Sequence, residues 1–194
     1  MKRVVKSFLI GLPIIIGAAG SLFGIYSYFF PNPPDMHKKD DIIGTWTANY
    51  SYSYDDKKII VSIKDKTSYF SNGKYNVSGK MSYKADKIDN SDIYVSYLIN
   101  GAGDWEINDK ELIISLNNLK STPEKVIYNG ENIDLKDLSL LENITHKKFP
   151  AVEDMIANGA SQSYKVIIDE HNYKTLDVIN PFGKDFNIEM YREK

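Results

Sequence analysis

Residues 44–54 read GTWTANYSYSY, and this stretch decides the fold class of the chain. Large or apolar side chains occupy every second position: Trp46, Ala48, Tyr50, Tyr52 and Tyr54. Small polar residues fill the positions between them. Because successive side chains of a β-strand point to opposite faces, this period of two predicts a strand with one buried face.

The same alternation continues along the chain. It predicts strands at residues 59–63, 68–70, 75–83, 93–99, 105–107 and 112–116. Asn72-Gly73 indicates a hairpin turn, and the Gly-rich residues 100–103 indicate a loop. Residues 44–116 therefore read as an antiparallel meander of five to seven strands.

The middle of the chain has a different pattern. Residues 122–124, Thr-Pro-Glu, resemble the start of a helix or turn. Four apolar residues follow at helical spacing: Leu135, Leu138, Leu141 and Ile144. A second short helix is expected from Pro150, and strands return at residues 164–168, 173–179 and 186–190. The predicted fold class is mainly β with a short helical insert (α+β), arranged as an antiparallel barrel or incomplete barrel.

Residues 7–30 form an uncharged apolar segment behind a basic tail at residues 1–6. A helix of this length spans the roughly 30 Å hydrocarbon core of a bilayer. We expect one N-terminal transmembrane helix, with residues 1–6 in the cytoplasm and the rest exported. Within the helix, small residues at Gly17, Gly20 and Gly24 mark a candidate packing face for a second helix.

Cleavage of residues 1–20 as a signal peptide is the alternative, because Ala18-Ala19-Gly20 offers small residues at a cleavage site. The continued apolar run to Phe30 favours an anchor. A charged linker at residues 31–43 then leads to an exported domain at residues 44–194. In bacteria this layout places the domain in the periplasm, tethered to the inner membrane.

Composition excludes several classes of function. Three of the 24 Lys and Arg residues precede the apolar segment, leaving 21 against 26 Asp and Glu in the rest. An acidic, mixed-sign domain argues against direct nucleic-acid binding. The chain has no Cys, and its three His fall at no ligand spacing. No nucleophile or phosphate-binding motif is present, so we expect neither an enzyme, a metal site nor a cofactor.

Fourteen tyrosines, many in phase on one strand face, suggest an amphipathic cavity. Ordinary β-propensity of Tyr is the alternative explanation. Trp46, Tyr50 and Tyr52 are the candidate ligand-binding residues. Gly44-Thr45-Trp46 also resembles the Gly-x-Trp signature of lipocalins, in which the Trp closes the barrel floor, so the expected barrel is lipocalin-like.

Two further motifs carry a family resemblance. They are Tyr-Phe-Ser-Asn-Gly-Lys-Tyr at residues 69–75 and Gly-Asp-Trp-Glu-Ile-Asn-Asp at residues 103–109. Together they resemble the ToxS family of transmembrane regulatory proteins, with its companions of the PsaF, MyfF and VtrC type. The family pattern has the two acidic residues around the Trp exchanged, as Glu-Trp-Asp. The signature residues here are Asn72, Gly73, Tyr75, Gly103, Trp105 and Ile107.

The resemblance implies a non-enzymatic companion that stabilises the periplasmic domain of a ToxR-like membrane-bound winged-helix transcription factor. In bile-sensing members of this class, the two chains form a shared barrel that takes bile salts and controls virulence gene expression. Two alternatives are a membrane-tethered lipocalin-like carrier that binds an amphiphile alone, and an envelope scaffold without a ligand.

Overall fold

A computed structural model of the chain describes residues 41–54, 59–88, 91–108, 111–138, 151–154, 159–180 and 184–194, together with Leu140 and Phe149. These residues are mostly β-strand, with almost no helix. The elements are β1 (Gly44–Tyr54), β2 (Ile59–Tyr69), β3 (Lys74–Ile88), β4 (Ser91–Asn108), β5 (Glu111–Tyr128), β6 (Glu131–Ile133), the 3-10 helix η4 (Val152–Asp154), β7 (Ala160–Asp169), β8 (Tyr173–Val178) and β9 (Phe186–Arg192).

All strand pairs are antiparallel, and their order closes the sheet into a ring. Strands β1 to β5 form the predicted meander, each paired with the next. The ring then continues through β7, β8 and β9 and returns to β1, while β6 pairs only with the end of β5. The strand-rich, antiparallel prediction is therefore confirmed.

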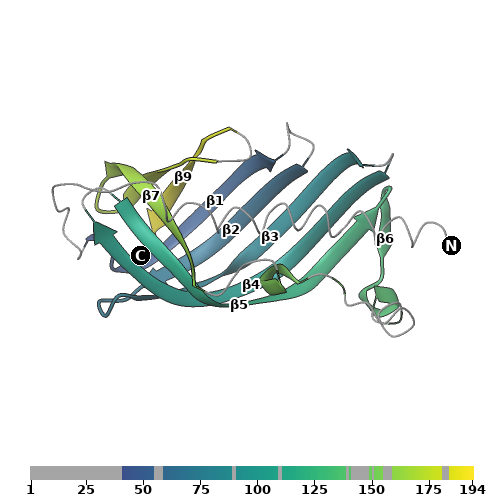
Figure 1. Ribbon diagram of the computed structural model, residues 1–194, viewed down its shortest axis with the longest axis horizontal. Coiled ribbons are helices and arrows are strands. Elements are labelled where there is room, and N and C mark those ends of the chain that lie inside the picture. Colours follow the sequence, from purple (N-terminus) through teal and green to yellow (C-terminus); the bar gives the residue numbers. More distant parts are fainter. Residues whose placement is uncertain are drawn as a thin grey trace.

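The ring is complete at only one end among the described residues. Strand β7 pairs with β5 over residues 111–116, and β9 pairs with β1 over residues 46–48. Figure 1 shows β7 and β9 at the left end, whereas β5 and β6 extend to the right beside the long strands β1 to β4. The left end is called the closed end below, and the right end the open end.

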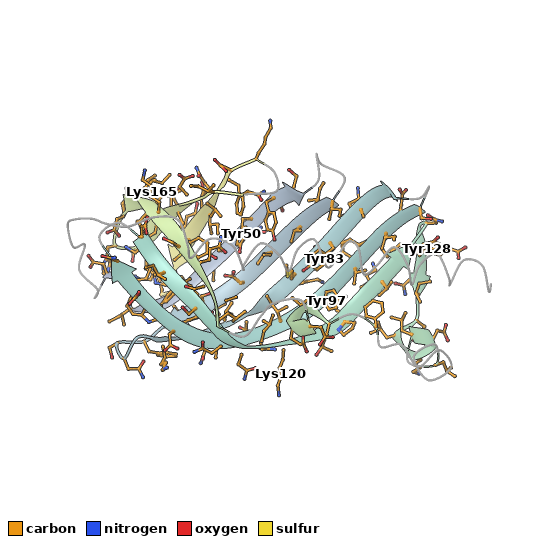
Figure 2. All side chains as sticks on the ribbon, in the orientation of Figure 1. Tyr50, Tyr83, Tyr97, Lys120, Tyr128 and Lys165 are labelled. Atoms are coloured by element: carbon orange, nitrogen blue, oxygen red, sulfur yellow. The ribbon has the colours of Figure 1, made fainter. Side chains whose placement is uncertain are left out.

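Each end has its own apolar core. The closed-end core consists of Ile42, Trp46, Ala48, Tyr69, Tyr75, Trp105, Leu112, Leu176, Val178, Ile188 and Met190. The open-end core gathers the inward side chains of β1 to β5 under three residues that follow β6 in the chain: Leu138, Phe149 and Val152. Figure 2 shows Tyr83 and Tyr97 over the inner face of the sheet and Lys120 pointing away from it. Residues after β6 thus cover apolar surface that no strand covers.

The expected loop at residues 100–103 is wrong, because these residues lie inside the continuous strand β4. The reason is close packing rather than a turn. A Cβ on Gly103 would lie 1.9 Å from the Ser115 backbone oxygen and 2.8 Å from the Tyr75 ring, and the register shifts by a bulge at this point. Glycine therefore permits three strands to approach one another.

The expected helix or turn start at residues 122–124 is also wrong. Pro123 lies within β5, opposite Tyr97 and beside a second bulge in the β4–β5 ladder. Proline is tolerated in strands at edges and bulges, and β7 does not reach this part of β5. Similarly, the two short strands expected at 59–63 and 68–70 form one strand, β2.

The remaining predictions for the middle of the chain are met in part. Residues 135–138 are helical, and the second expected helix is represented by η4, while residues 141–148 and 155–158 lie outside the described residues. The hairpin at Asn72-Gly73 is confirmed, with Gly73 at φ 78° and Lys74 N donating to Asn72 Oδ1 at 3.1 Å.

The predicted transmembrane helix at residues 7–30, with Gly17, Gly20 and Gly24, lies outside the described residues. In the part of the chain that the structure describes, no helix is both long and apolar enough to cross a bilayer.

Gly103→Ala tests the close approach of β3, β4 and β5. The added methyl group overlaps the Ser115 carbonyl, so we expect the free energy of unfolding to fall by roughly 2 kcal/mol or more in urea titration. The neighbouring outward-facing Ala102→Ser is the control and is expected to change it by less than about 0.5 kcal/mol. Equal stability of both variants would show that β4 does not pack as described.

Candidate ligand chamber

The closed ring encloses a cavity of about 150 Å³, which we call the chamber. Its walls are mainly aliphatic and aromatic side chains from β1 to β5 and β7 to β9, with Val152 contributed by η4. Five aromatic residues line it: Trp46, Tyr50, Tyr69, Tyr75 and Tyr164. The polar residues of the lining include Asp65, Thr67 and Gln162.

Asp65 lies on the inward face of β2. It follows the buried residues Ile59, Val61 and Ile63 on this face and is itself half-buried, and buried Thr67 and Tyr69 follow it. Its register partners are the two smallest side chains of the layer, Ala48 on β1 and Gly79 on β3. Gly79 leaves no room for a Cβ, which would lie 2.3 Å from the Lys64 carbonyl oxygen. Asp65 therefore lies between two small residues on a mainly apolar wall.

Burial controls the electrostatics of the chamber. It raises the pKa of Asp65 from 3.8 to about 7, and a hydrogen bond from the Thr67 side chain only partly opposes this shift. Burial and then the Asp65 charge raise the pKa of Tyr50 and of Tyr69 far above the usual range. The phenols consequently stay neutral, and Asp65 is the group in the chamber that changes charge near neutral pH.

Trp46 forms the floor of the chamber. It is 1% exposed, and its indole Nε1 donates to the Ile42 carbonyl oxygen at 2.7 Å. Two cations cover the ring: Arg192 Cζ lies 4.6 Å from the ring centroid and Lys174 Nζ 5.2 Å. This arrangement seals the closed end with an aromatic ring and a charged layer.

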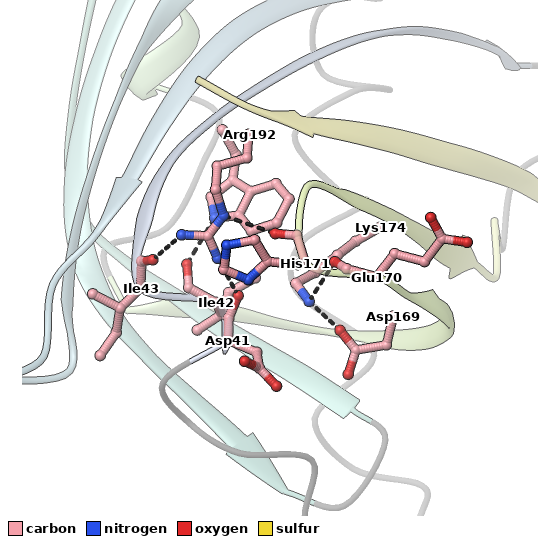
Figure 3. A network of polar contacts seen from close by, with 9 residues as sticks. Asp41, Ile42, Ile43, Asp169, Glu170, His171, Lys174 and Arg192 are labelled. Atoms are coloured by element: carbon pink, nitrogen blue, oxygen red, sulfur yellow. Dashed lines mark hydrogen bonds and ion pairs between the residues drawn. The ribbon is translucent and has the colours of Figure 1, made fainter. Parts of the chain in front are cut away.

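Arg192, on the last strand, holds the entry to the first strand (Figure 3). Its guanidinium donates to the backbone oxygens of Asp41 at 2.6 Å, Ile43 at 2.8 Å and His171 at 2.8 Å. Lys174 is buried and forms an ion pair with Asp169. Three separate segments thus meet at the floor.

At the other end the chamber reaches η4. Val152 N donates to Ser121 Oγ at 2.9 Å, and Ser121 N donates to Glu153 Oε2 at 2.9 Å. These bonds attach η4 to the stretch of β5 that β7 does not pair with. Val152, 1% exposed, thereby becomes part of the chamber wall.

The structure separates the three candidate ligand-binding residues. Trp46 and Tyr50 line the chamber. Tyr52 points into the open-end core and stacks on Phe186, with the ring centroids 4.9 Å apart. Tyr52 therefore lies beside the gap in the β1–β9 ladder beyond residue 48, which we call the open join, and does not line the chamber.

The six residues singled out in the two sequence motifs come together in space. Trp105 N donates to the Gly73 carbonyl oxygen at 2.7 Å, and the Trp105 indole donates to the Phe70 carbonyl oxygen at 3.0 Å. Tyr75 and Gly103 are register partners, Asn72 caps the turn, and half-buried Ile107 packs against the closed-end core. The signature is thus one structural unit, in which Trp105 braces the β2–β3 hairpin.

Three important residues were missed by sequence reasoning: Asp65, Tyr164 and Arg192. Asp65 follows the same alternation as the inward residues of β2. Predicting two strands at 59–63 and 68–70 placed Asp65 between strands, so this alternation was not recognised. Tyr164, whose hydroxyl donates to Gln162 Oε1 at 3.0 Å, was placed on a strand but on neither face. Nothing local to Arg192 indicates that it meets Trp46.

Within the described residues, no group of three His, Asp or Glu is arranged to hold a metal ion. His171 lies exposed in the turn between β7 and β8, and His37 and His146 lie outside the described residues. A scan against protein-family models finds no match, and a search of curated proteins finds none either.

Arg192→Lys tests the floor. Lysine keeps the positive charge but loses the planar fork that reaches three carbonyl oxygens, so we expect roughly 1–3 kcal/mol loss of stability in urea unfolding followed by Trp fluorescence. Tyr191→Phe, an exposed neighbour, is the control and is expected to remain within about 0.5 kcal/mol of the parent chain. If Arg192→Lys and Tyr191→Phe both changed the stability only slightly, Arg192 would not hold the chamber floor as described.

Asp65→Asn tests the chamber electrostatics. Asp65 binds its proton more tightly folded than unfolded, so its stabilising contribution is complete below about pH 4 and is lost as pH rises through 7. The difference in free energy of unfolding between Asp65→Asn and the parent chain should therefore shift in favour of the variant by on the order of 2–4 kcal/mol from pH 4 to pH 8.

Asp104→Asn is the control of opposite sign. Hydrogen bonds from Lys74 and Asn117 lower the pKa of this exposed carboxyl, so its contribution is present at neutral pH and lost in acid. A parallel pH dependence of both variants would contradict the placement of Asp65 in the chamber.

Proposed function

We propose that this chain is a membrane-anchored regulatory companion of the ToxS type, with a lipocalin-like periplasmic barrel. In this role it binds and stabilises the periplasmic domain of a ToxR-like membrane-bound transcription factor. Ligand binding in the barrel acts on the regulator by favouring one state of the assembly. The chain itself carries no catalytic role in this proposal.

The observation that carries the proposal is the open join between β1 and β9. Odd-numbered residues of β1 direct their backbone groups to this side, because Thr45 O accepts Glu193 N and Ser53 O accepts Asn180 Nδ2. Between them, Asn49 and Ser51 pair with β2 but have no ladder partner on β9 among the described residues. A strand edge without a ladder partner can accept a strand from another chain.

The convergence of both signature motifs on one unit, the β2–β3 hairpin braced by Trp105, supports the family assignment. Trp46 at the chamber floor supports the lipocalin-like description. The chamber of about 150 Å³ is smaller than the roughly 300–1,000 Å³ of sites for drug-sized ligands. A bile salt would therefore require a chamber enlarged by opening of the join or by the partner.

The second candidate is a tethered lipocalin-like carrier that acts alone. It is favoured by one specific observation: the chain closes its ring with its own strands, through β4–β5 and β1–β9. A carrier needs no partner to form the chamber. Saturable binding of an apolar fluorescent probe by the chain alone, unchanged by the regulator, would favour the carrier.

Ser51→Pro tests the companion role. Proline removes the backbone N–H that faces the open join, and a strand edge tolerates it. The chain is co-expressed with the membrane-bound winged-helix regulator that this proposal expects beside it in the genome, and co-purification and protease resistance of the regulator are measured. We expect the parent chain to protect the regulator and Ser51→Pro to reduce co-purification at least about tenfold, equivalent to about 1.4 kcal/mol.

Ser51→Ala keeps the N–H and is expected to behave as the parent chain. A regulator that is equally protease-sensitive with and without the parent chain would overturn the companion role.

A further inference from the structure

The chamber contains an acid without a basic partner. Among the described residues that line it, none is Lys, Arg or His, and Asp65 is the sole carboxyl group. At the floor, Arg192 binds backbone oxygens and Lys174 pairs with Asp169. Lys66 and Lys80, which border a second cavity with Asp65, pair with Glu193 and Glu124. Burying a carboxylate costs free energy unless it is paired, so this site lacks a counter-ion that a ligand can supply.

No large side chain of β1 or β3 stands in register beside Asp65. The residues beside it in register, Ala48 and Gly79, carry one methyl group and no side chain, respectively. Asp65 thus contributes the carboxyl group to the chamber lining.

Aromatic rings line the same cavity as this charge. Trp46, Tyr50, Tyr69, Tyr75 and Tyr164 all line the same cavity, and the Asp65 charge acts on Tyr50, Tyr69 and Tyr164. Aromatic faces attract organic cations, and a carboxylate forms charge-assisted hydrogen bonds with an ammonium group. Tyrosine rings and a carboxylate together are the chemistry that recognises an amine.

The volume limits the size of the ligand. A cavity of about 150 Å³ lined by apolar side chains is sufficient for a molecule of about the size of benzene. We propose that the chamber binds a small organic ammonium ion, whose ammonium group donates to the Asp65 carboxylate and whose short apolar body lies against the tyrosine rings. An organic anion of the same size would meet the Asp65 charge with no cation to offset it.

This inference rests on the proposed role of the chamber as a ligand site, but not on a partner chain. It also predicts a pH dependence. The titratable groups that interact with Asp65 are the phenols of Tyr50 on β1, Tyr69 on β2 and Tyr164 on β7, and Tyr75 on β3 lines the same cavity. Lys64, Lys66 and Lys80 have exposed side chains and line a second cavity with Asp65. Since the phenols stay neutral, ammonium binding should follow the ionisation of Asp65 and strengthen from pH 5.5 to pH 8.

The test uses the full chain in lipid nanodiscs and three ligands of one shape: benzylamine, benzyl alcohol and benzoate. Calorimetric titration at pH 8, with empty nanodiscs subtracted, measures each affinity. We expect benzylamine to bind at least about tenfold more tightly than benzyl alcohol, and benzoate to bind most weakly. Asp65→Asn should abolish the preference for the amine, whereas Asp104→Asn, on the outer face, should retain it.

A second measurement repeats the titrations of the parent chain at pH 5.5. We expect the affinity for benzylamine to be at least about fivefold lower than at pH 8, and the affinity for benzyl alcohol to be the same. Equal affinities for the three ligands, or tightest binding of benzoate, would overturn the ammonium inference while leaving a ligand chamber. Failure of all three ligands to bind would overturn the inference and the chamber's proposed role together.

Discussion

The contact between Trp46 and Arg192 is the interaction on which the rest of the structure depends. It joins the first strand to the last, 4.6 Å from cation to ring, and the same guanidinium holds the backbone of residues 41 and 43. An antiparallel sheet becomes a ring only where its two edge strands meet, and β1 and β9 share few ladder pairs. The short β1–β9 ladder alone closes the ring weakly, and the side-chain contacts at the floor therefore strengthen the closure.

Closure at one end has consequences for the other. Strands β1 to β5 are long, whereas β7 to β9 cover only part of their length, so the open end must bury its apolar face in another way. Leu138, Phe149 and Val152 do so, and the Ser121 and Glu153 hydrogen bonds attach η4 to β5. The chamber lies between the closed end and the residues that cover the open end, with Trp46 at one end and Val152 at the other.

Glycine and proline show where reading the sequence alone goes wrong. Residues 100–103 and Pro123 have the composition of turns, yet both lie within long strands at bulges. Their role is set by neighbouring strands, since Gly103 allows the Ser115 carbonyl to approach and Pro123 sits where no strand pairs on the far side of β5. Asn72-Gly73 was read correctly because a hairpin turn is decided by its own backbone.

The sequence by itself determined that the chain forms an antiparallel meander of strands and that Trp46 and Tyr50 share one face, because side-chain period is a local property. It did not determine which face lies inside, nor that Tyr52 would leave the chamber for the β1–β9 join. Only the tertiary structure placed Asp65 among tyrosines from four strands and brought Arg192 onto Trp46 across 146 positions. Charge burial and ring closure depend on residues distant in sequence, so no local pattern encodes them.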